Sequence, residues 1–329
     1  MDRRHALGAF ALLGFFAGNG HTQSTKVFRV GVLRPGSAKE PASVQREPFE
    51  RGLRELGWIP GSNVLIDYRY GEGDAARLPR LAAELVGRSM DVIVATGAPA
   101  AHAVRAKNAT VPIVMAASSD PVADGLAVNL ARPGKNTTGI ANFAFEMDGK
   151  RLELLKETFP RTGRVALLAN PDSGEPEYRV RIGELRQDAR RLGVELEVFE
   201  ITRTEQIAGA FSAIERGRFD ALMVRPDPRV FDLARTQIAA AAARLRLPAI
   251  YAFRIFPEAG GLMSYGESIP GFHYSAASYV SRILRGANAS DLAFERPTKF
   301  ALVLNLKAAK ALGVEFPKAT LFRADEVIQ

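Results

Sequence analysis

The stretch Phe28-Arg29-Val30-Gly31-Val32-Leu33 is strand-like, and it has a counterpart in Arg164-Val165-Ala166-Leu167-Leu168. Each stretch is followed by an amphipathic segment that ends in Leu-Gly, and then by a second strand-like run. We therefore expect two similar lobes in tandem, and a cleft between lobes is where small molecules bind. Further correspondences pair residues 91–95 with 220–224 and 111–114 with 247–250.

Hydrophobic periodicity predicts alternating strands and helices in both lobes. Strands that are separated by helical crossovers are mainly parallel, with helices on both faces of the sheet. The predicted fold class is α/β, with two doubly wound, Rossmann-like lobes. In the first lobe we expect strands at 28–33, 63–70, 91–95 and 111–116 and helices at 45–56, 76–87 and 98–107. In the second lobe we expect strands at 164–169, 195–201, 220–225 and 249–252 and helices at 176–192, 204–216 and 229–246.

The repeat stops after Ala252, and the remaining pattern predicts a return to each lobe in turn. A strand within 260–266 and a helix over 269–285 are expected to rejoin the first lobe, and a strand over 300–306, followed by a helix at 308–312, the second. A further helix is expected to begin at Gly149, before the second set of strands. Several chain crossings form a hinge, because a few backbone torsions can change while both sheets stay rigid. The expected division is 26–143 plus about 262–290 for the first lobe, and 144–261 plus about 291–329 for the second.

The N-terminal segment 1–25 is expected to be a cleaved signal peptide. It contains Arg3 and Arg4 before an apolar run over 6–17, which is too short to span a bilayer comfortably. The pattern predicts export to the periplasm, by the general or the twin-arginine route. No later segment is long and apolar enough to cross a membrane.

Composition excludes several function classes. The chain has no cysteine, so disulfides, thiolate metal sites and a cysteine nucleophile are excluded. Its four histidines lack metal-ligand spacing, and we expect neither a metal nor a cofactor. The formal charge is +8; Arg3 and Arg4 against Asp2 account for +1 within the leader, which leaves +7. The arginines are spread along helix faces, so we expect no nucleic-acid partner, and we expect a monomer.

Ligands of open parallel sheets bind outside the carboxyl ends of the strands, and this rule selects short segments of the chain. Ser37 follows the first strand. Thr96, Gly97 and Ala98 join a strand to a helix, so free N–H groups and the positive helix end face the cleft and suit a carboxylate. The alternative is that Thr96 simply caps the helix.

Other polar and aromatic residues stand at strand ends or crossings. Three aspartates, Asp120, Asp172 and Asp227, could each bind a ligand ammonium or hydroxyl, or could instead cap a turn. Two asparagines lie on the hinge side, where they could contact the ligand or have a purely structural role. Two tyrosines could form an aromatic wall against the ligand. Phe253 is interpreted as core packing, and Phe143 also lies near a crossing. The candidates are Asp120, Asp172 and Asp227; Asn142 and Asn170; Tyr251 and Tyr265.

The sequence does not favour an enzyme. It has no Gly-x-Gly-x-x-Gly or phosphate-loop motif. Ser37, Ser118 and Ser173 have no histidine placed at a strand end to act as a base. A racemase or isomerase on the same scaffold is the enzymatic alternative, and a ligand-sensing receptor module is the non-enzymatic one.

Several segments resemble the ABC-transporter substrate-binding proteins of the family that includes bacterial tryptophan/tyrosine-type binding proteins. They are Lys150-Arg151-Leu152-Glu153-Leu154-Leu155-Lys156-Glu157, Ser119-Asp120-Pro121-Val122, Asn136-Thr137-Thr138-Gly139 and the tail 297–313. The resemblance implies a type 1 periplasmic-binding fold, extracytoplasmic capture of a solute, and partners in a permease and its cytoplasmic ATPase. The loop 34–41 is basic and contains proline, and Arg225-Pro226-Asp227 places a cation beside a carboxylate, which leaves room for a carboxylated solute other than an aromatic amino acid.

The predicted mechanism is capture by hinge closure, because a ligand that touches both lobes only in the closed form shifts the population toward it. We expect a carboxylate to bind near Thr96–Ala98 and Ser37. An amino or hydroxyl group is expected at Asp120 or Asp227, with Asn142 bridging near the hinge.

Overall fold

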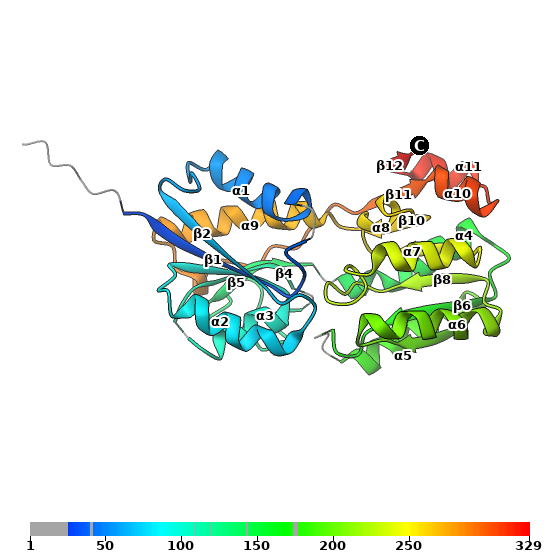
Figure 1. The fold of residues 1–329 in the computed structure, drawn as a ribbon, viewed down its shortest axis with the longest axis horizontal. Coiled ribbons are helices and arrows are strands. Elements are labelled where there is room, and N and C mark those ends of the chain that lie inside the picture. The colour runs from blue at the N-terminus through cyan, green and yellow to red at the C-terminus, as the bar shows by residue number, and fades with distance from the viewer. Residues whose placement is uncertain (1–25, 40–41, 109, 119, 143, 174–176) are drawn as a thin grey trace, which may run out of the picture.

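The computed structural model describes residues 26–39, 42–108, 110–118, 120–142, 144–173 and 177–329. Two sheets lie side by side, each with its own helices, and Figure 1 shows the two lobes joined by thin connections. The expected signal peptide, Ser119 and Phe143 lie outside the described residues. Of the helices in the described ranges, none has the length and hydropathy that crossing a bilayer requires.

The first sheet has the strand order β2-β1-β3-β4-β5, and all its pairs are parallel. Its strands are β1 (Phe28–Arg34), β2 (Val64–Tyr70), β3 (Val92–Thr96), β4 (Ile113–Ser118) and β5 (Thr137–Ala141). Helices α1 (Arg46–Glu55) and α9 (Ile269–Leu284) cover one face, where they lie side by side although they are far apart in sequence (Figure 1). Helices α2 (Leu78–Val86) and α3 (Ala98–Arg105) cover the other face.

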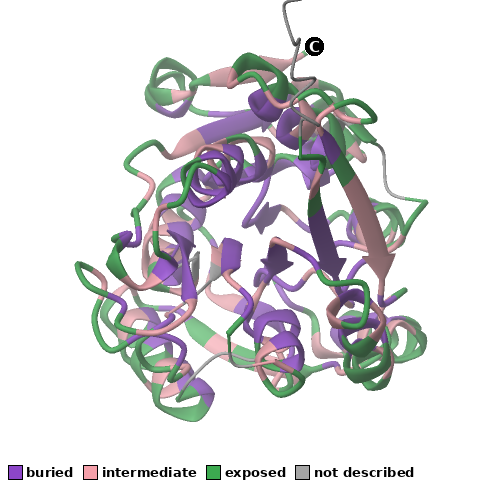
Figure 2. Cartoon of the chain, turned by 90° about the vertical axis from the view of Figure 1, so that its left-hand side faces the viewer, coloured by how far each residue is buried: buried purple, intermediate pink, exposed green. Residues whose placement is uncertain are grey.

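The central strand β3 reads Val-Ile-Val-Ala-Thr and is buried along its whole length, because helices cover both faces of the sheet. Val92 and Val94 contribute to the cluster under α1 and α9, whereas Ile93 and Ala95 contribute to the one under α2 and α3. This alternation follows from the two-residue period of a strand. In Figure 2 the buried residues accordingly lie on the strands and on the helix sides that face them.

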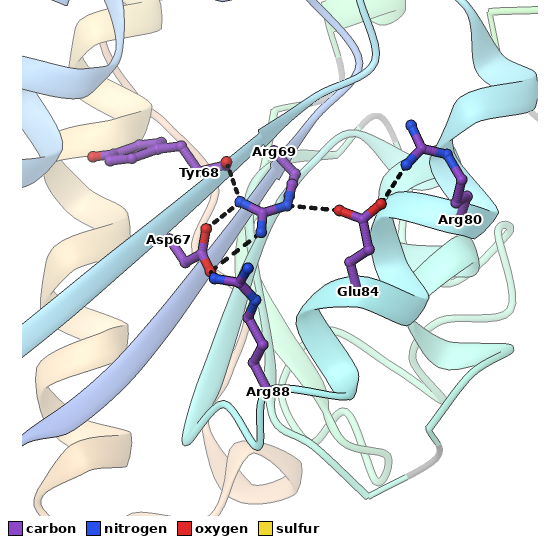
Figure 3. A network of polar contacts seen from close by, with 6 residues as sticks. All are labelled: Asp67, Tyr68, Arg69, Arg80, Glu84 and Arg88. Atoms are coloured by element: carbon purple, nitrogen blue, oxygen red, sulfur yellow. Dashed lines mark hydrogen bonds and ion pairs between the residues drawn. The ribbon is translucent and has the colours of Figure 1, made fainter.

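The edge strand β2 is held to α2 by a network of charged side chains (Figure 3). Asp67 accepts hydrogen bonds from Arg69 and, over 2.6 Å, from Arg88. Glu84 of α2 accepts from Arg69 over 3.0 Å and also pairs with Arg80. Because each carboxylate serves two guanidinium groups, the polar face of an edge strand is fastened to the helix above it.

The second sheet has the order β12-β11-β10-β9-β8-β6-β7, and only the β10–β11 pair is antiparallel. Its strands are β6 (Arg164–Ala169), β7 (Glu195–Glu200), β8 (Ala221–Val224), β9 (Ala249–Tyr251), β10 (Met263–Gly266), β11 (Ala301–Asn305) and β12 (Glu326–Ile328). Helices α6 (Ile207–Gly217) and α7 (Arg235–Arg244) pack on one face. On the other face lie α4 (Asp148–Thr158), α5 (Tyr178–Arg191) and α10 (Leu306–Leu312).

The expected duplication is confirmed by topology. The order β7-β6-β8-β9-β10 of the second sheet repeats the order β2-β1-β3-β4-β5 of the first. Four elements were not expected from the sequence: β5, α8 (Ile255–Glu258), α11 (Lys318–Arg323) and β12. Short 3-10 segments occur at Ala42–Val44, Ala75–Arg77, Ala144–Met147, Thr204–Gln206 and Ala289–Asp291.

The helix expected over 229–246 begins only at Arg235, and the residues before it form a series of turns. The Asp227 side chain accepts hydrogen bonds from the backbone N–H groups of Arg229 and Val230, at 2.8 and 2.7 Å. An aspartate that binds the backbone two residues on favours a turn over a helix. The chain between β8 and α7 is therefore a loop.

Three crossings connect the lobes, and their positions differ from the expected boundaries. β10 pairs with β9 and β11 of the second sheet, so the chain returns to the first lobe with α9 and not near 262. Residues up to Glu295 still lie beside β5, because Ala141 N–H donates to the Glu295 carbonyl oxygen over 2.9 Å. The crossings therefore fall at about 142–147, 267–268 and 296–300.

Candidate ligand-binding cleft

A cleft lies between the two lobes and draws its walls from both. It holds about 800 Å³ of space outside atoms, part of which is open to solvent. A cleft between two lobes is a common place for a small-molecule ligand to bind. The first lobe and α9 contribute Pro35, Gln45, Thr96, Gly97, Ala98, Pro99, Ala117, Asn142, Ile269, Phe272 and His273; the crossing and the second lobe contribute Phe145, Ser173, Pro226, Pro228, Arg229, Asp232 and Phe253.

The turn between β3 and α3 presents polar groups to the cleft. Gly97 adopts φ +79°, a left-handed conformation that favours glycine, and its N–H donates to the Ala117 carbonyl oxygen over 2.8 Å. The first N–H groups of α3, beginning at Ala98, have no partner within the helix. The hydroxyl of Thr96 is buried and has no hydrogen-bond partner among the described residues. The expected segment Thr96, Gly97 and Ala98 therefore lines the cleft with donors for an anion.

Two charged residues of the cleft were not singled out from the sequence. Arg229 and Asp232 both line it, and they come from the loop between β8 and α7. Arg229 donates to the carbonyl oxygen of Asp172, and its Nη2 lies 3.9 Å from Asp227 Oδ2. Asp232 is buried, with its backbone N–H bound to the Asp227 carbonyl oxygen over 3.0 Å. Neither residue was a candidate from the sequence, because the pattern over 229–246 predicts a helix. The Pro-Asp-Pro sequence before them does indicate a turn.

Helix α9 contributes a neutral histidine to the cleft. His273 is buried, and burial lowers its pKa to about 3, with the positive charge of Arg34 acting in the same direction. The imidazole is therefore uncharged at neutral pH. Gln45, at the start of α1, is a second buried polar residue in this wall. Neither was expected from the sequence, because their positions depend on how α1 and α9 pack together.

The rest of the cleft is largely apolar. Phe145 from the first crossing, Phe253 after β9 and Phe272 of α9 line it together with Ile269. The guanidinium of Arg225 lies 4.6 Å from the centre of the Phe145 ring. Phe253, interpreted from the sequence as core packing, is buried and also lines the cleft. These aromatic rings suit a flat or apolar portion of a ligand.

Of the remaining sequence candidates, Asn142 lines the cleft where the chain leaves β5. Ser37 does not line it. Its hydroxyl donates to Glu72, which also accepts from the Ala38 N–H over 2.9 Å; these bonds hold the pKa of Glu72 below its usual range. Asp120 caps its own turn, because its Oδ1 accepts from the N–H groups of Val122 and Ala123 at 3.0 Å each.

Asp227, Asn170 and Asp172 form a structural group beside the cleft and do not line it. Asp227 is fully buried and accepts from Asn170 Nδ2 over 2.8 Å in addition to its two backbone bonds. Asn170 Oδ1 accepts in turn from the Asp172 N–H over 2.9 Å. Burial raises the pKa of Asp227 despite its hydrogen bonds and the nearby Arg229. These residues hold the loop that carries Arg229 and Asp232.

The two candidate tyrosines are also placed away from the cleft lining. Tyr251 is completely buried and stacks on Phe256 at a centroid distance of 4.6 Å. Tyr265 stacks on Phe300 at 6.0 Å, and its carbonyl oxygen accepts from Arg151 Nε over 2.8 Å. Among the described residues, no group of three or more histidine, aspartate and glutamate side chains is placed to hold a metal ion.

Two mainly parallel sheets in duplicated lobes, with a cleft between them, are the architecture of the type 1 periplasmic-binding fold. The family model for ABC transporter substrate binding protein matches residues 39–328. The chain belongs to this family.

This chain is similar to known substrate-binding proteins in sequence and in structure. A tyrosine-binding protein of Clostridioides difficile is 24% identical over 298 residues, which is 90% of this chain and 84% of that protein. An ABC domain from Streptococcus pneumonia, solved in complex with L-Trp, is 25% identical with a TM-score of 0.81 over 92% of this chain and 99% of that one. A ligand-free, open substrate-binding protein from Clostridium difficile is 26% identical with a TM-score of 0.65, over 92% and 100%.

Proposed function

We propose that this protein captures an α-amino acid with an aromatic or large apolar side chain and delivers it to an ABC importer. One observation carries the proposal: a single apolar cleft combines anion-binding groups from one lobe with a buried carboxylate from the other. An α-amino acid carries the complementary pair of charges. The names of the tyrosine-binding relative and of the L-Trp complex favour the same class of ligand.

The ligand carboxylate is assigned to the turn between β3 and α3. The Ala98 N–H, the positive end of α3 and the Thr96 hydroxyl all present donors to a negative group. Arg229 adds a positive charge to the same cleft. Donors on rigid elements bind an anion well because little ordering is required when the ligand arrives.

The ligand ammonium is assigned to Asp232, the acidic residue in the lining of the cleft. An ion pair with this buried carboxylate is screened less than an ion pair at the surface. Phe145, Phe253 and Phe272 supply the wall for the side chain. An amino acid therefore fills the cleft with its charged end and its apolar end both matched.

Closure of the lobes over the ligand is the proposed mechanism of capture. Gly73 in the first lobe lies against the loop of the second: a Cβ built there would be 2.9 Å from Leu233 Cδ1 and 3.0 Å from the Arg229 carbonyl oxygen. The TM-score of 0.81 to the L-Trp complex against 0.65 to the open protein, at similar identity, supports a closed arrangement here. A ligand that bridges both lobes shifts the population toward this form.

The proposed location is outside the cytoplasmic membrane, with a permease and its ATPase as partners. Family membership supports this assignment, since these proteins belong to ABC transport systems. The positively charged, then apolar segment at 1–17 supports export. The protein is proposed to bind its ligand without converting it.

Isothermal titration of residues 26–329 with the twenty natural L-amino acids tests the proposal. We expect 1:1 binding of at least one aromatic or large apolar amino acid. Tryptamine, which lacks the carboxylate, and indole-3-propionate, which lacks the ammonium, should each bind at least tenfold more weakly than L-tryptophan. Asp232→Asn should weaken L-tryptophan much more than indole-3-propionate. Absence of any amino-acid binding, or turnover of the ligand, would overturn the proposal.

A further inference from the structure

A second cavity lies on the hinge side of the molecule. It holds about 1520 Å³ of space outside atoms, compared with about 800 Å³ for the cleft, and both values include space open to solvent. Its walls come from the second and third crossings, from α8, and from the β10–β11 pair; Ser264, Glu267, Phe300 and Val303 are among them. The cavity is therefore partly apolar and partly polar.

Two side chains line both the cleft and the hinge-side cavity: Phe253, which follows β9, and Ile269, the first residue of α9. The two residues just before α1 also lie between these spaces: Gln45 lines the cleft, and Val44 lines the hinge-side cavity. These residues form a partition that the two spaces share. Phe253 supplies its largest side chain and is 6% exposed.

The partition lies at the apolar part of the cleft. Phe272 and Ile269 belong to the same apolar wall as Phe253, whereas the groups assigned to the ligand carboxylate lie on the turn between β3 and α3. A ligand held by its amino and carboxylate groups directs its side chain toward the apolar wall. The Phe253 ring is then the obstacle that a longer side chain meets.

We propose that Phe253 is a specificity-determining residue that sets the maximum length of the ligand side chain by closing the cleft off from the hinge-side cavity. This inference rests on the proposed function. The physical basis is that a close-packed aromatic ring cannot be compressed, so an over-long side chain forces neighbouring groups out of place. Removing the ring joins two existing spaces, so a longer ligand gains room without further rearrangement.

The test uses para-phenyl-L-phenylalanine as the long probe and the tightest-binding natural amino acid as the short one. Phe253→Ala is the variant, and Phe211→Ala is its matched control. Both remove a buried phenyl ring from the second lobe, but Phe211 lines neither the cleft nor the hinge-side cavity. The measured quantity is the ratio of the dissociation constants for the long and the short probe in each protein.

In the wild type we expect the long probe to bind at least 100-fold more weakly than the short one. Phe253→Ala should reduce this ratio at least tenfold, and Phe211→Ala should leave it within threefold of the wild-type value. Equal acceptance of both probes by the wild type, an unchanged ratio in Phe253→Ala, or the same change in Phe211→Ala would overturn the inference.

The failure of the proposed function gives a different result, because the wild type would then bind no natural amino acid at all. If Phe253→Ala does not fold, judged by circular dichroism, Phe253→Leu is measured with O-methyl-L-tyrosine against L-tyrosine. Phe253→Leu should again lower the ratio of the dissociation constants for O-methyl-L-tyrosine and L-tyrosine. An unchanged ratio would contradict the assignment.

Discussion

Asn170 Nδ2 donates a hydrogen bond to Asp227 Oδ2 over 2.8 Å, and both side chains are buried beside the cleft. The other oxygen of Asp227 accepts from two backbone N–H groups of the following turn. The carboxylate is therefore fully used in holding the loop between β8 and α7. The sequence had made Asp227 a candidate for direct ligand contact, with turn capping as the alternative.

Asp227→Ala is accordingly predicted to destabilise the ligand-free protein. The substitution leaves three donors, two of them buried, without their acceptor, and the expected loss in free energy of unfolding is about 3 kcal/mol. Urea unfolding without ligand measures it. A ligand-free stability equal to that of the wild type would show that the carboxylate has no structural role.

Gly73→Ala is predicted to weaken ligand binding by hindering closure. Gly57 is the matched control, because it also has a positive φ, +88° against +81° for Gly73, but a Cβ added to Gly57 would meet no atom within 4 Å. Both alanine variants should lose about 1 kcal/mol of stability through backbone strain. Only Gly73→Ala should also raise the dissociation constant, by about tenfold, which is ~1.4 kcal/mol. Equal affinities of the two variants in titration calorimetry would contradict the contact between the lobes.

Tyr251→Phe is predicted to stabilise the protein by about 1 kcal/mol, because it removes a buried hydroxyl that has no partner among the described residues. Tyr279→Phe provides the comparison. The Tyr279 hydroxyl donates to the Ala293 carbonyl oxygen over 2.8 Å, so its removal should cost about 1 kcal/mol. Thermal unfolding distinguishes the two substitutions. Destabilisation of Tyr251→Phe to the same extent as Tyr279→Phe would show that its hydroxyl has a partner.

Glu267, on the second crossing, is predicted to make stability depend on pH. Burial raises its pKa to about 8 from an ordinary 4.5; Arg151 and Arg296 oppose this shift, and Glu146 adds to it. Between pH 4.5 and 8 the Glu267 carboxyl is ionised in the unfolded chain but protonated in the folded protein. Stability is therefore lost as pH rises through this window, by at most about 1.4 kcal/mol per pH unit.

Glu267→Gln removes this contribution, since an amide does not ionise. The difference in free energy of unfolding between Glu267→Gln and the wild type should grow in favour of the variant from pH 5 to 8. Urea unfolding at four pH values measures the difference. A difference that stays constant with pH would contradict the raised pKa.

The duplicated architecture was predictable from sequence because each strand and helix carries its own period and the two lobes repeat it. The turn at Thr96–Ala98 was predictable for a related reason: a buried strand runs directly into a helix, and the carboxyl ends of parallel strands face the cleft. Asn142 was predictable from its place where the chain leaves the first lobe.

Arg229 and Asp232 were not predictable in the same way, because the residues around them have a helical pattern that the Asp227 turn overrides. His273 and Gln45 reach the cleft only through the packing of α9 against α1, which joins segments more than two hundred residues apart. Tyr251 stands at a strand end like Thr96 does, yet its side chain points into the core. The ends of the predicted strands therefore indicate which segments lie near the cleft. Tertiary packing determines which side chains of those segments face it.

The distance between the lobes tests the central claim most directly. Since the chain has no cysteine, Ala76→Cys and Val180→Cys give two specific spin-label positions on exposed residues, one in each lobe. Pulsed electron paramagnetic resonance then measures the distance with and without saturating amino acid. Closure on the ligand predicts a broad distribution that becomes narrower and shorter when ligand binds. Identical distributions in the two conditions, for a protein that binds its ligand, would contradict capture by closure.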